Sequence, residues 1–197
     1  MGKGEQTKER ILAQAAVLFN RQGFAGSSMA DVMEATGLRK GGIYRHFESK
    51  EALALEAFDH AVGLVRARMV ARLQGRTHAV ERLRAIVGVF REYAVDPPVP
   101  GGCPVMNTAI ETDDGNPELR ARARAVMDEW RTSIRRTVEK GVERGELRPG
   151  VDADALASVV IALLEGGIMM SKLYRDPAHL LRAVEHLDRH VAEHVAA

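Results

Sequence analysis

The chain has 197 residues, which is enough for one large domain or for a small domain followed by a medium one. Hydrophobic residues make up 46% of it and aromatic residues only 5%, a composition typical of a globular protein that favours helices over sheets. The formal net charge is +1, so bulk charge makes no case for nucleic-acid binding. The charge is unevenly placed, however, because residues 1–50 hold eight Lys and Arg against five Asp and Glu.

The first fifty residues contain three helical patterns. Apolar residues recur at helical spacing over 7–23, which predicts a helix of about four turns. Ser28 stands where an N-cap belongs, ahead of a short helix that closes at Gly37. A third, equally short helix is expected over 39–47. Two short helices joined by a tight turn that contains glycine are typical of a helix-turn-helix.

The next patterns predict longer helices. Ser49 caps a helix that should run to Gly75 and connect two domains. Another helix is expected over 77–95. The segment 96–102 is rich in proline and glycine, which stop a helix, so we expect a stiff and exposed loop there.

Four helical segments fill the remainder. Pro104 suits the first turn of a short helix. A long helix follows Pro117, and we expect Gly141 and Gly145 to fray its end. Asp152 begins a nearly continuous apolar helix, and a last helix closes the chain.

These patterns predict an all-α protein of about nine helices, because no alternation typical of strands appears. We expect a three-helix DNA-binding domain over 1–48 and a helical bundle over 49–197. The chain carries one cysteine, Cys103, no apolar signal segment near its start and no run of about 18 apolar residues, so we expect it in the cytoplasm.

The third predicted helix carries the side chains that reading DNA requires. A helix-turn-helix places its second helix in the major groove, where side chains meet base edges and flanking groups hold phosphates. Ile43 and Phe47 would anchor the inner face, and two consecutive glycines would let the backbone approach a partner closely. Taken alone, the same pattern fits a surface helix with solvated basic residues.

A longer stretch of the sequence distinguishes between these two interpretations. Ser28-Met-Ala-Asp-Val, Ala35-Thr-Gly-Leu, Lys40-Gly-Gly-Ile-Tyr-Arg-His-Phe and Ser49-Lys-Glu-Ala-Leu53 closely resemble the DNA-binding signature of the TetR family of bacterial regulators. The resemblance covers residues 7–55, and beyond it only helix number and length agree.

The resemblance implies roles for particular residues. Ser28, Tyr44 and Lys50 match positions that contact phosphate, and the recognition helix supplies the base contacts. Arg39 departs from the family pattern, which often has a small hydroxyl residue there to cap that helix. The full set of expected DNA-binding residues is Ser28, Arg39, Lys40, Gly41, Gly42, Tyr44, Arg45, His46 and Lys50.

The resemblance also implies how the protein assembles and responds. Family members bind palindromic DNA as dimers, with two recognition helices about 34–36 Å apart. They dimerise through the last two helices and hold a small-molecule effector inside the C-terminal bundle, and repression is their usual output. The segment 158–171 fits close helix packing in such a dimer, although an ordinary buried helix would look the same.

Candidates for the effector site lie on the expected inward stripes of the central helices, where core filling is the alternative role for each. They are Met69, Phe90, Cys103, Met106, Ile110, Met127 and Trp130. Two carboxylates on the same helices, Glu111 and Glu129, would either select a cationic ligand or face solvent.

Cys103 supports an alternative function. It precedes a predicted helix N-terminus, a position that lowers a thiol pKa, so it is either a sensor of electrophiles and oxidants or an unreactive cysteine. His186, His190 and His194 recur every four residues, but no cysteine or carboxylate cluster completes a metal site. We therefore expect no metal and no cofactor.

Two other classes of protein are less well supported. The sequence lacks a Gly-rich phosphate loop, zinc-type spacing and a G-x-S-x-G elbow, so we expect no enzyme. A DNA-binding protein without an effector would have a dry bundle, whereas a cavity of about 300 Å³ or more between the central helices would count against it.

Overall fold

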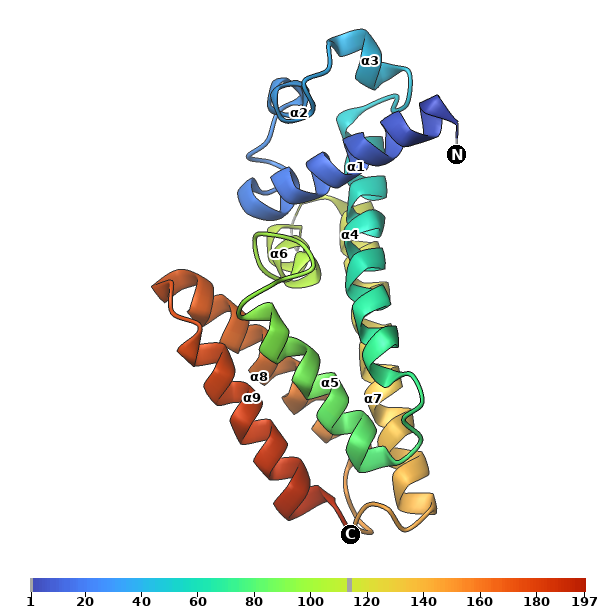
Figure 1. Ribbon diagram of the computed structural model, residues 1–197, viewed down its shortest axis with the longest axis vertical. Helices are drawn as coiled ribbons and strands as arrows, with labels where there is room; N and C mark the ends of the chain where they lie inside the picture. Colours follow the sequence, from blue (N-terminus) through green and yellow to red (C-terminus); the bar gives the residue numbers. More distant parts are fainter. Residues whose placement is uncertain (1, 113–114) are drawn as a thin grey trace. The chain divides into compact units, whose positions relative to one another are not determined.

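The computed structural model describes residues 2–112 and 115–197, and the predicted all-α fold is confirmed (Figure 1). In the described residues the only extended pairing is an isolated bridge between Leu147 and Ala196. A π-helical turn, Val191–Val195, ends the last helix. Nine α-helices occur in the described part of the chain: α1 (Lys3–Gln22), α2 (Met29–Thr36), α3 (Lys40–Tyr44), α4 (Lys50–Leu73), α5 (Ala79–Tyr93), α6 (Pro104–Glu111), α7 (Pro117–Glu143), α8 (Ala153–Tyr174) and α9 (Ala178–His190).

The helices form two compact units. The N-terminal unit comprises Met1–Val65 and Pro98–Arg124, and the C-terminal unit comprises Arg66–Pro97 and Ala125–Ala197. Both α4 and α7 contribute residues to each unit. This division by compactness does not coincide with the expected boundary between residues 48 and 49. That boundary concerns function, namely where the DNA-binding domain ends, and it stays a prediction.

The ends of the first helices follow from local chemistry. At the end of α1 the N–H of Gly23 donates to the carbonyl of Phe19, and Gly23 has a φ of 83°, which favours glycine. The hydroxyl of Ser28 accepts from the backbone N–H of Asp31 and so caps α2, which Gly37 ends in the left-handed conformation. These predicted ends are confirmed.

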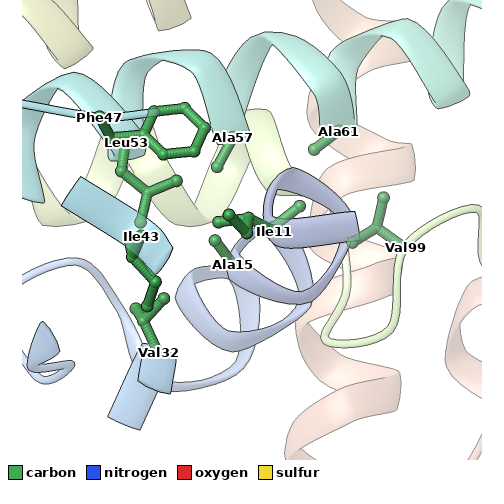
Figure 2. Packing of buried hydrophobic residues seen from close by; sticks show 10 residues of the cluster. Ile11, Ala15, Val32, Ile43, Phe47, Leu53, Ala57, Ala61 and Val99 are labelled. Carbon is green, nitrogen blue, oxygen red and sulfur yellow. The ribbon is translucent and has the colours of Figure 1, made fainter. Parts of the chain in front are cut away.

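The core of the N-terminal unit joins α1, α2, α3 and α4. Its members are almost without exposed surface: Ile11, Ala15, Ala16, Val32, Ile43, Phe47, Leu53, Ala57, Ala61 and Val99 (Figure 2). Burying the Val, Leu, Ile and Phe side chains of this cluster stabilises the fold by about 1.5–3 kcal/mol each, so the cluster holds α3 in place.

The segment 96–102 is not the fully exposed loop that we expected. Val99 is only 1% exposed and belongs to the N-terminal core. The side-chain amide of Asn20 on α1 donates to the carbonyls of Pro100 and Gly102, at 3.1 and 2.9 Å. Backbone groups that would otherwise need water are therefore bonded to α1, which lets the loop pack inward.

In the C-terminal unit, α5, α8 and α9 pack against one another. Gly167 of α8 permits close approach, because an added Cβ would lie 3.1 Å from the Cα of Leu180 on α9. Arg84 on α5 donates two hydrogen bonds to Asp188 on α9, at 2.7 and 2.9 Å. This bidentate pair joins α5 to α9.

Gly141 does not fray α7, contrary to expectation. It is buried inside the helix, and an added Cβ would lie 2.5 Å from the Cβ of Ala79. The expectation was wrong because a glycine can serve close packing as well as chain termination. Gly145 follows the end of α7, with a φ of 71°.

The helix α8 is the most apolar element of the described chain. By length and composition alone it could cross a membrane, since one 18-residue window has a mean hydropathy of 1.7. This is weak evidence, because the core helix of a folded protein meets the same criteria, and 39% of that window is buried within the chain. The remainder leaves an apolar surface on the outside of α8.

Candidate nucleic-acid interface

The helix α3 is shorter than the predicted 39–47. It covers only Lys40–Tyr44, and the chain then turns, with the N–H groups of His46 and Phe47 both donating to the carbonyl of Ile43 at 2.9 and 3.1 Å. Two glycines in a helix of five residues weaken it by about 1 kcal/mol each relative to alanine, so packing rather than propensity must hold this helix.

The packing separates the residues of α3 into two sides. Ile43 and Phe47 are buried in the N-terminal core, at 0% and 2% exposure, as the sequence predicted. Tyr44 is 41% exposed. The structure places Arg39, Lys40, Gly41, Tyr44 and Arg45 on the exposed side, whereas Gly42, His46 and Lys50 are half-buried.

The two consecutive glycines have different surroundings. A Cβ added at Gly42 would lie 3.6 Å from the Cβ of Leu38, an ordinary contact. A Cβ added at Gly41 would meet no atom within 4 Å in the described part of the chain. Packing within the protein therefore does not require glycine at position 41.

Two lysines near α3 lie over aromatic rings. The ammonium of Lys40 lies 5.5 Å from the centre of the Tyr44 ring, and that of Lys50 lies 4.2 Å from the centre of the Phe24 ring. Such cation–π contacts contribute about 0.5–1 kcal/mol at exposed sites, and they restrict where the charges can lie. The contact with Tyr44 thereby keeps the charge of Lys40 on the exposed side of α3.

Ser28 is already engaged within the protein. Its hydroxyl and its backbone N–H both donate to Oδ2 of Asp31, at 2.7 and 2.6 Å. These hydrogen bonds, the side-chain one first, lower the pKa of Asp31 below its usual value. A hydroxyl has one hydrogen, so Ser28 could donate it to a phosphate only by giving up this bond.

Arg39 occupies the N-cap position of α3, but no side-chain hydrogen bond caps the helix there. The departure from the family pattern therefore has a structural counterpart. The guanidinium of Arg39 is exposed, and in the described part of the chain it is committed to no ion pair.

A support for the turn between α1 and α2 could not be seen in the sequence. The carboxylate of Glu111, at the end of α6, accepts hydrogen bonds from the N–H groups of Phe24 and Ala25, at 2.8 and 2.7 Å. The Glu111 carboxylate is therefore bonded within the protein and does not simply face solvent, and its ligand role stays a prediction. Its partners lie 86 and 87 residues away in the chain, and no local pattern indicates them.

Glu129 is the second carboxylate for which a ligand role was considered. It is exposed and forms a bidentate pair with Arg66, at 2.6 and 3.2 Å. Of the two interpretations, the structure therefore favours a solvent-facing ion pair.

The candidates for the effector site have unequal burial. Phe90 is 8% exposed and Cys103 fully buried, but Ile110 is 63% exposed, so the inward position expected for Ile110 is wrong. Met69, Met106, Met127 and Trp130 are half-buried. These candidates do not line the small cavity of about 30 Å³ in the N-terminal unit, which has room for little more than a water molecule.

Cys103 occupies the N-cap position of α6, as its place in the sequence predicted. It has no exposed surface, so an electrophile or oxidant cannot reach its sulfur without movement of the chain.

The rings of His186, His190 and His194 follow one another along the last helical segment, and the centres of successive rings are 6.4 and 5.4 Å apart. In the described residues no group of three metal-binding side chains is close enough to hold an ion.

The outer side of α8 is an apolar face. Ile168 and Leu164 point into the C-terminal unit, but six large side chains of the same helix are exposed: Val159, Leu163, Met169, Met170, Leu173 and Tyr174. We call these six residues the α8 face. Exposed apolar surface of this extent in a folded protein usually marks contact with another molecule.

Comparison with known proteins agrees with this architecture. Residues 11–57 match the family of bacterial regulatory proteins named after TetR, and residues 79–187 match the C-terminal domain similar to the tetracycline repressor. A TetR transcriptional regulator from Chloroflexus aurantiacus is 53% identical, with a TM-score of 0.95 over 100% of this chain and 99% of that one. A TetR-family regulator from Cytophaga hutchinsonii is 34% identical, with a TM-score of 0.88 over 100% and 98%.

A curated relative extends the same result to sequence. The helix-turn-helix transcriptional regulator LmrA of Bacillus subtilis is 28% identical over 177 residues, which cover 89% of this chain and 91% of LmrA. The matched domains, the nine helices of the described residues and the exposed basic side of α3 agree. The chain belongs to the TetR family, and it is a DNA-binding transcriptional regulator with a helix-turn-helix.

Proposed function

We propose that the protein is a repressor that binds a palindromic operator as a homodimer and is released by a small-molecule effector. The observation that carries the proposal is the two-sided nature of α3. Ile43 and Phe47 fix its inner side in the core, while Arg39, Lys40 and Arg45 remain exposed beside an open glycine. A recognition helix needs this combination of rigid support and free donors.

The proposed contacts divide by chemistry. Arg45 and Lys40 donate to base edges in the major groove, and Gly41 lets the backbone come near the DNA. Tyr44 and Lys50 bind phosphates, as does Arg39, which has no capping duty to perform. Ser28 contributes least, because its hydroxyl is held by Asp31. His46 and Gly42, which are half-buried, support the helix.

The proposed dimer uses the last two helices. The α8 face is exposed in a single chain, and a second copy would cover it with the same residues around a two-fold axis. The family's usual assembly supports this choice. Two copies of α3 would then meet successive major grooves, about 34–36 Å apart.

The proposed effector binds within the helical bundle and shifts the dimer toward a state that holds DNA less well. Candidates for its contacts in the C-terminal unit remain Met69, Phe90, Met127 and Trp130. A coupling of about 1–3 kcal/mol between the two sites would lower operator affinity by roughly 5- to 150-fold. No catalytic step is part of this proposal, and the protein would act in the cytoplasm, where its operator lies.

A thiol switch at Cys103 is the alternative form of the response. The full burial of Cys103 favours the non-covalent effector instead. Mild oxidation of the wild type and of Cys103→Ser distinguishes the two mechanisms. Loss of operator binding in the wild type alone supports the switch, whereas equal behaviour excludes it.

The experiment that tests the proposal is fluorescence anisotropy on DNA from the region upstream of the protein's own gene and on a scrambled duplex, at two salt concentrations. We expect the native fragment to bind at least about tenfold more tightly, with a steep dependence on salt. Equal and weak binding to both duplexes would contradict an operator in that region.

A further inference from the structure

The C-terminal unit contains a cleft whose lining includes none of the proposed DNA-binding residues. Its volume is about 530 Å³, within the range of small-molecule sites. It is lined by the segment that leads into α5, the first turn of α5, the second half of α7 and the residues just after α7. None of the candidate effector residues is among its lining residues.

The cleft is strongly basic. Five cations line it, namely Arg76, Arg82, Arg136, Lys140 and Arg144, against two carboxylates. Such a surplus of one sign in a concave surface raises the local concentration of anions. A charged residue on a helix is usually solvated, but the convergence of cations from three segments is not explained by solvation alone.

Both carboxylates in the cleft are already engaged. Glu146 accepts the N–H of Ala79 at 2.6 Å and lies 3.9 Å from Arg144, and Glu129 pairs with Arg66. Because Glu146 caps the start of α5, the helix N-terminus itself is not offered to a ligand. The carboxylates therefore do not neutralise the other cations of the cleft.

Four cations of the cleft have no carboxylate partner among the residues that the structure describes. The guanidinium groups of Arg76 and Arg82 each donate to a backbone carbonyl, of Arg72 and Arg76 respectively. Arg136 and Lys140 are exposed and make no ion pair in the described chain. These two residues are four apart on α7, so they present their charges side by side on one face of the helix.

Hydroxyl groups complete the lining. Thr132 precedes Arg136 by one helical turn, and Ser133 and Thr137 form the neighbouring row of α7. Thr137 is only 7% exposed, and its hydroxyl donates to the carbonyl of Ser133 at 2.9 Å. Phosphate oxygens accept hydrogen bonds from guanidinium, ammonium and hydroxyl groups, and all three kinds of donor line this cleft.

We propose that this cleft binds a small organic or inorganic polyanion with two or more phosphate groups. The cations come from two segments of the lining, since Arg76 and Arg82 lie just before α5 and in its first turn, and Arg136 and Lys140 lie on α7. Two linked phosphates offer these four cations more acceptor oxygens than a single phosphate does. The regulator thereby has a second ligand site, separate from the one that releases DNA.

Calorimetric titration of the full-length protein with sodium tripolyphosphate, with inorganic phosphate as the comparison, tests the proposal. We expect one tripolyphosphate per chain, bound at least about tenfold more tightly than phosphate, because bidentate and multiple charge-assisted bonds add up. Failure of tripolyphosphate to bind overturns the proposal, whatever the operator experiment gives.

Matched variants distinguish a specific binding site in the cleft from nonspecific electrostatic attraction of tripolyphosphate to the protein. Arg136→Gln with Lys140→Gln removes two charges from the cleft, and Arg91→Gln with Arg120→Gln removes two exposed charges that lie outside it, on α5 and α7. We expect the first pair to weaken tripolyphosphate binding about tenfold and the second to leave it within about twofold. Thermal unfolding verifies that each variant is folded.

Two outcomes would contradict the site. If the two double variants lost the same affinity for tripolyphosphate, binding would depend on the net charge of the protein and not on the cleft. If the cleft variant instead weakened binding to duplex DNA and tripolyphosphate did not bind, the cleft would contact DNA phosphates and the proposal would be wrong.

Discussion

The outward sides of α3 and α8 differ although their inward sides are alike. Both helices bury aliphatic residues, such as Ile43 in α3 and Leu164 in α8. Outward, α3 presents Lys40 and Arg45, whereas α8 presents large apolar residues such as Leu173, which is 71% exposed. The buried side therefore shows only that a helix belongs to a fold, and the exposed side shows which kind of molecule it can meet.

The largest effect should come from Phe47, the buried residue that follows α3. We expect Phe47→Ala to lower the free energy of unfolding by about 3–5 kcal/mol, because it leaves a cavity in the N-terminal core. Tyr44→Ala, on the exposed side, should cost less than about 1 kcal/mol. Urea denaturation of the two variants measures the difference, and equal losses would mean that the two sides of α3 are wrongly assigned.

The next effect should come from the outer side of α8. We expect Leu173→Glu to convert dimers to monomers, because an unpaired charge buried in an interface costs about 2–5 kcal/mol. Sedimentation velocity measures the change. Val95→Glu is the matched control, since Val95 is 88% exposed and lies outside α8. A Leu173→Glu variant that stays dimeric would show that the α8 face is not the interface.

A smaller effect distinguishes two kinds of contact near α3. We expect Lys50→Ala to weaken binding to every duplex and to reduce the salt slope by about one, because it removes one phosphate contact. Arg45→Ala should instead relax sequence preference. Arg120→Ala, which removes an exposed charge from α7, is the control. An unchanged salt slope in Lys50→Ala would exclude the phosphate role.

The smallest effect concerns pH and the ion pair that joins α5 to α9. Arg84 holds the pKa of the Asp188 carboxyl below the usual 3.8, chiefly because its side chain donates hydrogen bonds to Asp188 and also because of its positive charge. A carboxyl with a lowered folded-state pKa stabilises the fold above pH 3.8, and this stabilisation is lost as the pH falls through the folded-state pKa.

The size of that contribution should be below about 1 kcal/mol, because both partners are partly exposed to solvent. Unfolding of the wild type and of Asp188→Asn between pH 5 and pH 2 measures it. We expect the difference between the two proteins to shrink at acid pH. A constant difference over this range would mean that the Asp188 carboxylate is not the source.

The sequence predicted what neighbouring residues determine. The caps at Ser28 and Ser49 and the stop at Gly37 depend on chemistry within three or four residues, and each is present. The length of α3 was overestimated, because a pattern of buried residues at Ile43 and Phe47 does not show that the chain leaves the helix after Tyr44.

Contacts between distant segments could not be predicted. The inward packing of Val99 depends on Asn20, and the role of Glu111 depends on the turn after α1, which lies more than 80 residues earlier. Gly141 gives no sign in the sequence that Ala79 will pack against it. The basic cleft is likewise formed by segments whose charges look like solvated helix surface when read singly.

Hydroxyl-radical footprinting of the wild-type protein on its operator reports, in one measurement, both the DNA contacts of α3 and the pairing of two chains through the α8 face. We expect two protected patches whose centres lie one helical turn apart, about 10–10.5 base pairs, and the loss of both patches in Leu173→Glu. A single protected patch from the wild type, or two patches that persist in a monomeric Leu173→Glu variant, would contradict this expectation.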